Sequence, residues 1–169
     1  MSDGERAKGA MLARLRGEIA EDRAMLERCM TDARLAKARL GGAPVDPAVL
    51  ALAAVALHGW YTGLESVLER VARQLDGDVP TGSRWHRELL TQMSVEVPRL
   101  RPAVLPRTVI APLAELLAFR HFFRHAYGIV LDADRIATRL ALLFAAVDEV
   151  DVALDMFDSF LVEAGVAAE

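Results

Sequence analysis

The sequence predicts an all-α protein: an antiparallel four-helix bundle with an extra short helix and a proline-rich connection before the third long helix. Apolar residues recur at helical spacing in four long segments, and no stretch shows the alternation of a strand. With 53% hydrophobic residues, the 169-residue chain can bury a sizeable core. These observations predict a single helical domain over residues 1–169, with its core at about 45–140.

The first and last helices have the most regular apolar pattern. Five residues recur every seven positions within residues 5–40: Leu12, Ile19, Leu26, Ala33 and Leu40. In the last helix, residues 133–163, apolar positions step by four and three from Ile136 to Leu161. Such spacing is typical of bundle seams, so we expect these two helices to pack together. Asp132 is expected to cap the last helix.

The second helix is expected to begin at Asp46-Pro47 and to run to about Leu75. Gly59 and Gly63 lie in its interior, where each glycine costs roughly 1 kcal/mol relative to alanine. They predict the close approach of another helix, with a partner subunit as one candidate. His58, among apolar neighbours, is interpreted as a satisfied core or interface histidine.

A short basic helix, residues 84–93, follows a loop and is expected to be capped by Ser83. Its Arg84 and Arg87 are cationic, and His86 is interpreted as an exposed or capping residue. Residues 97–106 contain three prolines and are therefore expected to form an extended connection.

The third long helix is expected to start at Thr108 or Ala111, to end near Gly128, and to carry the segment FRHFFRHAYG at residues 119–128. At about 100° per residue, one arc of this helix is polar: Arg120, His121, Arg124, His125 and Tyr127. The opposite arc is apolar: Phe119, Phe122, Phe123 and Ala126. One face could therefore anchor in a core while the other presents cations and imidazoles.

Charge is unevenly distributed along the chain. The net charge is −4, but residues 80–139 carry 9 Lys+Arg and 5 Asp+Glu, whereas residues 140–169 carry 7 acidic residues and no basic one. A local basic patch on an acidic protein can contact a few phosphates without binding long duplexes indiscriminately. The lone Cys29, the absence of a secretory signal at the start and the shortness of the apolar runs predict a cytoplasmic protein without a membrane span.

The polar arc has the residue types for metal-free cleavage of RNA. That reaction needs a base for the ribose 2′-OH, an acid for the leaving 5′-oxygen and a cation for the phosphorane. Arg120 and His125 supply these types, but they lie about 140° apart around the helix, so two copies across a dimer axis would complete a site better than one. His121 and His125 lack the glutamate of zinc helices, so no metal and no cofactor is expected. An ordinary solvated basic face remains the other interpretation.

The pattern Arg120-x4-His125-x-Tyr127 resembles the Arg-x4–6-His motif of HEPN-domain ribonucleases, and the trailing tyrosine resembles HepT-like toxins. The likeness extends in order over roughly residues 50–136. It includes HGWYTGLE at 58–65, the segment at 76–90 and the proline-rich connection.

This resemblance implies an all-α HEPN bundle and a homodimer with a metal-independent endoribonuclease site at its interface. It also implies a nucleotidyltransferase antitoxin that attaches AMP to Tyr127. Arg120 would stabilise the phosphorane, His125 would be the general acid or base, and His121 would support the site or share proton transfer. Charge alone makes three further residues candidates for RNA binding: Arg124, Arg84 and Arg87.

An alternative function is a non-catalytic helical module that docks a nucleotidyltransferase or another protein. The net acidic composition and the lack of a long basic stripe favour it.

Overall fold

The computed structural model describes residues 3–41, 44–124 and 131–166. Within these ranges the chain forms five α-helices and no strand, which confirms the all-α prediction. The helices are α1 (Asp3–Arg39), α2 (Pro47–Val71), α3 (Trp85–Met93), α4 (Ile110–Arg124) and α5 (Ala133–Val166).

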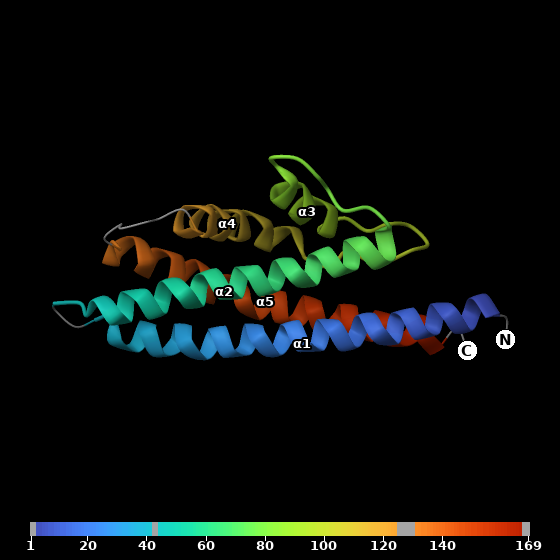
Figure 1. The fold of residues 1–169 in the computed structure, drawn as a ribbon, viewed down its shortest axis with the longest axis horizontal. Helices are drawn as coiled ribbons and strands as arrows, with labels where there is room; N and C mark the ends of the chain where they lie inside the picture. The colour runs from blue at the N-terminus through green and yellow to red at the C-terminus, as the bar shows by residue number, and fades with distance from the viewer. Residues whose placement is uncertain (1–2, 42–43, 125–130, 167–169) are drawn as a thin grey trace.

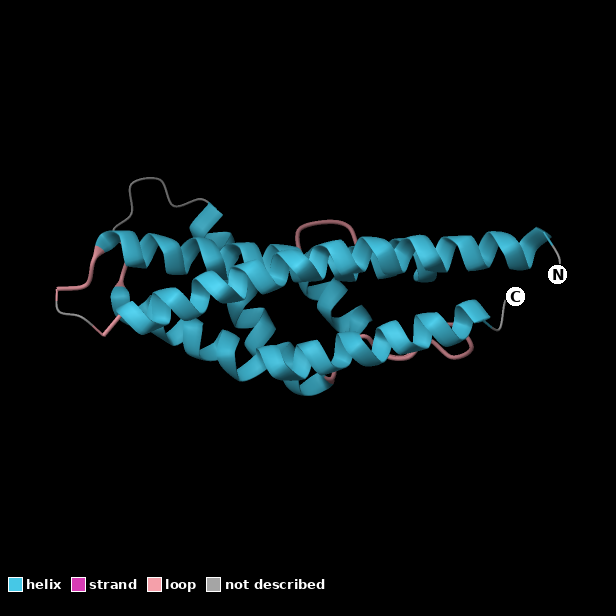
Figure 2. Ribbon diagram, turned by 90° about the horizontal axis from the view of Figure 1, so that it is seen from below, coloured by secondary structure: helices cyan, strands magenta, loops and turns pink. Residues whose placement is uncertain are grey.

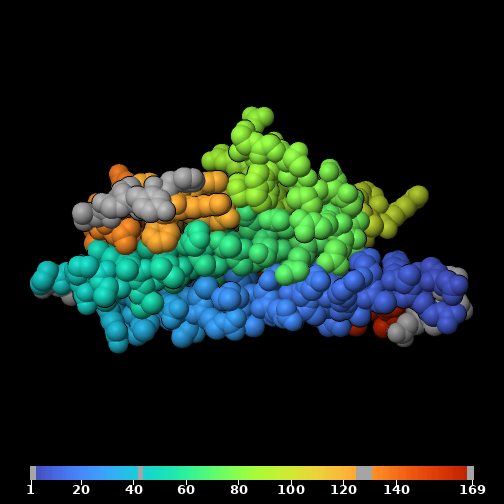
Figure 3. Space-filling view, in the orientation of Figure 1, coloured from blue at the N-terminus to red at the C-terminus, as the bar shows by residue number. Residues whose placement is uncertain are grey.

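The four long helices run alternately up and down, so the start of α1 and the end of α5 lie at the same end of the bundle (Figures 1 and 2). The short α3 lies on the same side of α2 as α4 and packs against both. Together with the loops around it, α3 stands out from the bundle surface (Figure 3).

Helix α1 packs on α5, as predicted, but it packs more extensively on α2. Its contact with α5 includes two ion pairs, Arg16–Asp158 and Arg23–Asp155, at 2.8 and 2.7 Å. Their order along the two helices shows that α1 and α5 are antiparallel.

The two glycines of α2 explain why α1 and α2 lie so close. A Cβ on Gly59 would lie 2.9 Å from Cys29 Sγ, and one on Gly63 would lie 2.9 Å from Leu26 Cδ2. The helix that approaches them is therefore α1 of the same chain, and a partner subunit is not needed to explain them.

Helix α2 begins as predicted, because the Asp46 side chain accepts the backbone N–H of Ala48 at 2.8 Å and Pro47 occupies the first turn. It continues into a π-helical turn, Ala72–Asp76, which ends at Gly77 with φ 73°. By length and composition Pro47–Asp76 could cross a membrane, but 56% of its most apolar window is buried inside the bundle, as in a core helix.

The proline-rich connection is not simply extended. It contains a tight turn closed by Val97 and Arg101, and a 3-10 turn at Arg107–Val109. Arg101 is 3% exposed. All five of its N–H groups are used: two on the Asp76 carboxylate at 2.6 Å, and three on backbone carbonyls at 3.0–3.2 Å. One buried guanidinium therefore ties this connection to the end of the π-helical turn.

Two capping predictions have different outcomes. Ser83 does not cap α3, because the N-cap is Arg84 and no side chain bonds the first turn. Asp132 does cap α5, since its carboxylate accepts the backbone N–H of Arg135 at 2.9 Å.

Candidate active site

A buried carboxylate, Glu65, lies where α2, α3 and α4 meet. Only 3% of this residue is exposed, although it carries a charged group in the apolar middle of α2. Arg120 reaches it from α4 and His86 reaches it from α3. Buried carboxylates are costly unless they are paired, so this convergence accounts for the presence of Glu65 in the core.

Arg120 turns toward its own α2. Its Nη1 lies 3.3 Å from Glu65 Oε2, and its Nε donates to Thr62 Oγ1 at 3.1 Å. Nη1 is buried and, among the described residues, has no partner in hydrogen-bond geometry, so the contact with Glu65 is an ion pair rather than a hydrogen bond. With 11% of its side chain exposed, Arg120 is largely held inside the subunit rather than standing free on a polar arc.

His86 is the second partner of Glu65. Its Nδ1 lies 2.6 Å from Oε1 and 3.0 Å from Oε2, and Trp85 stacks on the ring with centroids 3.6 Å apart. Since His86 is only 9% exposed, its interpretation as an exposed or capping residue was wrong. With Nδ1 against the carboxylate, Nε2 is the nitrogen left for a ligand.

Burial favours the neutral forms of both groups in this pair. Desolvation raises the pKa of Glu65 from 4.5 to about 7, against the opposing charge of Arg120. Desolvation also lowers the pKa of His86, and the charge of Arg120 adds to that shift. His86 is therefore a neutral imidazole at neutral pH, the form that can accept a proton.

A basic cavity of about 220 Å³ opens beside this pair. Arg84, Arg87, His86 and His121 line it together with Ser83, just before α3, and with small and apolar residues of α4. The rings of His86 and His121 meet edge to face, with centroids 4.8 Å apart. The structure thus brings the predicted His121, Arg84 and Arg87 to one place, beside a histidine that was not predicted as a site residue.

The remaining predicted residues lie elsewhere. Arg124 is exposed at the last position of α4 and does not line this cavity. His125 and Tyr127 lie outside the described residues.

His58, interpreted as a satisfied core or interface histidine, packs against Phe123 with centroids 5.6 Å apart. Within the described part of this single chain its Nδ1 is buried without a hydrogen-bond partner, so no partner that would satisfy it lies there. Burial and the charges of Arg120 and Arg124 lower its pKa.

The arrangement can hold an anion and move a proton. A guanidinium and a neutral imidazole share one carboxylate, next to a cavity lined by two exposed arginines. Among the residues that the structure describes, no three His, Cys, Asp or Glu side chains gather as a metal site.

Sequence reasoning missed Glu65 and Thr62 as site residues, although both lie in the segment at 58–65 that it singled out. The available signal was a carboxylate in the largely apolar middle of a helix, with Thr62 three residues before it on the same face. Because Glu65 contacts residues 21 and 55 positions away, its partners could not be read from local spacing.

The fold and site define an all-α bundle that gathers an arginine and two histidines around a buried carboxylate and a basic cavity. The model of the HepT-like protein family matches residues 52–161, a segment that contains Glu65, His86 and Arg120. The chain therefore belongs to the HepT-like family of HEPN-type toxins. A search of curated proteins and a search of solved structures gave no match.

Proposed function

We propose that this protein is the toxin of a HepT-type toxin–antitoxin pair and acts as a metal-independent endoribonuclease. The observation that carries the proposal is the convergence of Arg120 and His86 on the buried Glu65, beside the cavity that Arg84, Arg87 and His121 line. This arrangement supplies a cation and a neutral imidazole next to a basic surface that suits a phosphodiester.

Each group has a definite role in the proposed reaction. Neutral His86 takes the proton of the ribose 2′-OH through Nε2, while Glu65 holds its Nδ1. The 2′-oxygen then attacks the phosphorus, and Arg120 balances the charge of the phosphorane. His125, the motif histidine, gives its proton to the 5′-oxygen as the P–O bond breaks, which leaves a 2′,3′-cyclic phosphate.

A cleavage assay with single-stranded RNA in EDTA tests this proposal. We expect cleavage by the wild type, and a loss of roughly 100- to 1000-fold in Arg120→Ala, the scale of removing one transition-state donor. His125→Ala should lose activity as well. Arg14→Ala is the matched control, because Arg14 is exposed on α1. Full activity in both Arg120→Ala and His125→Ala would sink the assignment.

We propose a homodimer in which Arg120 of one copy works with His125 of the other. Mixing the Arg120→Ala and His125→Ala proteins under exchange conditions tests this arrangement. Random pairing makes half of the dimers mixed, each with one intact site, so about a quarter of the wild-type activity should return. A mixture as inactive as its two components would show that the residues act within one copy.

We also propose a nucleotidyltransferase partner that attaches AMP to Tyr127. Incubation with the partner and ATP should raise the intact mass by one or more AMP units, and Tyr127→Phe should prevent this. Tyr61→Phe is the control, because the Tyr61 side chain is 2% exposed and burial raises its pKa. An unchanged wild-type mass would remove Tyr127 from this role.

A groove of about 560 Å³ between α5 and the proline-rich connection favours the alternative function, a docking module for the same partner. Val152 and Met156 are 59% and 69% exposed along it. If the protein cleaves no RNA in any buffer and forms a stable complex on co-expression, the docking function replaces the nuclease.

A further inference from the structure

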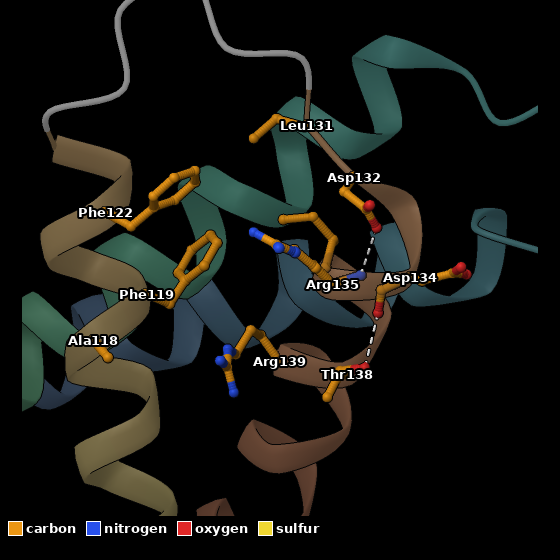
Figure 4. A pocket seen from close by; sticks show the side chains of 10 residues that line it. Ala118, Phe119, Phe122, Leu131, Asp132, Asp134, Arg135, Thr138 and Arg139 are labelled. Carbon is orange, nitrogen blue, oxygen red and sulfur yellow. Dashed lines mark hydrogen bonds between the residues drawn. The ribbon is translucent and has the colours of Figure 1, made fainter.

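A second, larger hollow lies on the other flank of α4. Its volume is about 730 Å³, and it is bounded by the C-terminal half of α4 and the first turns of α5 (Figure 4). Ala118 lines both this hollow and the basic cavity. The two depressions therefore adjoin at Ala118, whose side chain is an exposed methyl group.

The larger hollow contains an aromatic surface. Phe122 was expected on the buried arc of α4, but it is 44% exposed. Its ring and that of Phe119 face the hollow (Figure 4). Nucleobases stack on exposed aromatic rings, and removal of one such ring weakens binding roughly 5- to 100-fold.

The hollow also contains Arg135, a cation for which the described residues supply no carboxylate partner. The Arg135 side chain extends toward the phenylalanines (Figure 4), and among the described residues its guanidinium makes no ion pair. Arg139, which lines the same hollow, is paired with Glu115 at 2.9 Å. The two carboxylates at the rim belong to the start of α5, and one of them, Asp132, accepts the backbone N–H of Arg135.

We propose that this hollow is a nucleotide subsite for single-stranded RNA. A base stacks on Phe122, its phosphate pairs with Arg135, and the strand crosses α4 over Ala118 into the basic cavity. The larger hollow is wide enough for one nucleotide, since sites for small ligands commonly measure about 300–1000 Å³. The inference rests on the proposed function, because it defines the path of the same substrate toward Arg120 and His86.

Binding of a non-cleavable probe tests the subsite independently of catalysis. The probe is a fluorescein-labelled 2′-O-methyl octa-adenylate, which lacks the nucleophilic 2′-OH, and the readout is fluorescence anisotropy in EDTA. Phe122→Ala should weaken binding roughly 5- to 100-fold, whereas Phe122→Trp should bind at least as well as the wild type. Arg135→Ala should weaken binding of the probe. It should also reduce the slope of log affinity against log salt concentration by about the amount that one phosphate contact contributes. The controls are Met25→Ala, 46% exposed, and Arg14→Ala, both on α1.

Ala118→Trp tests the crossing point. Because Ala118 is exposed, the large side chain should be tolerated by the fold. It should weaken binding of the octanucleotide and leave binding of a 2′-O-methyl dinucleotide unchanged, since the dinucleotide need not cross α4.

Unchanged affinity in both Phe122→Ala and Arg135→Ala would overturn the subsite, even if the protein cleaves RNA. If no variant and not even the wild type cleaves RNA, while Phe122→Ala and Arg135→Ala still bind the probe more weakly than the wild type, only the proposed nuclease activity is overturned. If Phe122→Ala and Arg135→Ala instead change the oligomeric state measured by light scattering, and Phe122→Trp does not restore binding, the hollow is an interface between subunits and the nucleotide assignment fails.

Discussion

The imidazole of His86 and the carboxylate of Glu65 form a buried pair, with Nδ1 and Oε1 2.6 Å apart, and the same carboxylate lies 3.3 Å from the Arg120 guanidinium. One side chain on α2 therefore contacts two of the three groups that we assign to the chemistry, His86 and Arg120. Because burial raises the pKa of Glu65 to about 7, this orienting group changes its charge at neutral pH.

RNA cleavage should therefore increase as the pH rises through about 7. Ionised Glu65 accepts the Nδ1 proton of His86, which leaves Nε2 free to act as the base. Glu65→Gln should lose this rising limb, and its rate should fall roughly 10- to 100-fold, as when the orienting partner of a histidine is removed. Glu21→Gln is the control, because Glu21 is exposed on α1. Identical pH–rate profiles in the two variants would exclude the orienting role.

The same pair should give stability a distinctive pH dependence. With a folded-state pKa raised from 4.5 to about 7, Glu65 binds more protons in the folded than in the unfolded state, so its contribution to the free energy of unfolding declines as pH rises through that window. The lowered pKa of His86 acts in the opposite direction. The contribution of His86 to the free energy of unfolding is fully present only at a pH above 6.5, the ordinary pKa of histidine, and it is lost as the pH falls.

Urea denaturation of the wild type and Glu65→Gln at pH 4.5, 6 and 7 separates the two effects. The free energy of unfolding of the wild type minus that of the variant should fall by up to about 3 kcal/mol from pH 4.5 to pH 7. This order-of-magnitude value follows from about 1.4 kcal/mol for each unit by which a pKa is shifted. A difference that is constant with pH would show that Glu65 titrates normally in the folded protein.

The contact between Gly59 and Cys29 predicts a destabilising substitution with a specific rescue. Gly59→Ala should lower the free energy of unfolding by about 1–3 kcal/mol, because its Cβ would lie 2.9 Å from Sγ. In the Cys29→Ala background the same substitution should instead gain up to about 1 kcal/mol from helix propensity. Gly17→Ala is the control and should stabilise in both backgrounds, because its Cβ would meet no neighbouring side chain within 4 Å. Equal effects of Gly59→Ala in both backgrounds would contradict the close contact.

Loss of Arg101 should be among the most damaging single changes. Arg101→Met leaves the buried Asp76 carboxylate, 8% exposed, without its charged partner and, among the described residues, with only the amide of Gln92 as a side-chain donor, so we expect a loss of about 3–5 kcal/mol in the free energy of unfolding. Arg99→Met, at an exposed position two residues away, removes the same charge and should have little effect. Thermal and urea unfolding of the two variants measure the difference in their stability. A similar free energy of unfolding in both would mean that the contact between Arg101 and Asp76 contributes little.

The helices could be predicted from the sequence because their signals are local. The seven-residue repeat within residues 5–40, the Asp46-Pro47 start and the Asp132 cap all depend on neighbours within one or two turns. The glycines of α2 correctly predicted a close helix approach, but which helix approaches depends on tertiary packing. Here it is α1.

The candidate site could be predicted only in part. Arg120, His121, His125, Arg84 and Arg87 carry polarity and charge that are visible in the sequence, and the family pattern added a role for Tyr127. The pairing of His86 with Glu65 spans 21 residues and depends on how α3 crosses α2. Phe122 is exposed although Phe119 on the same helical arc is buried, so a helical arc alone placed it incorrectly.

The buried Arg101 also has a dynamic consequence for the basic cavity. Its hydrogen bonds to the carbonyls of Gln92 and Val95 hold the last turn of α3 and the chain just after it, and the His86 contact with Glu65 holds the start of α3. This short helix is therefore anchored at both ends. We therefore expect the backbone amides of α3 to exchange hydrogen together with those of neighbouring α2 rather than through separate local opening. The cavity wall that carries Arg84 and Arg87 then behaves as part of the rigid core, preorganised before any ligand arrives.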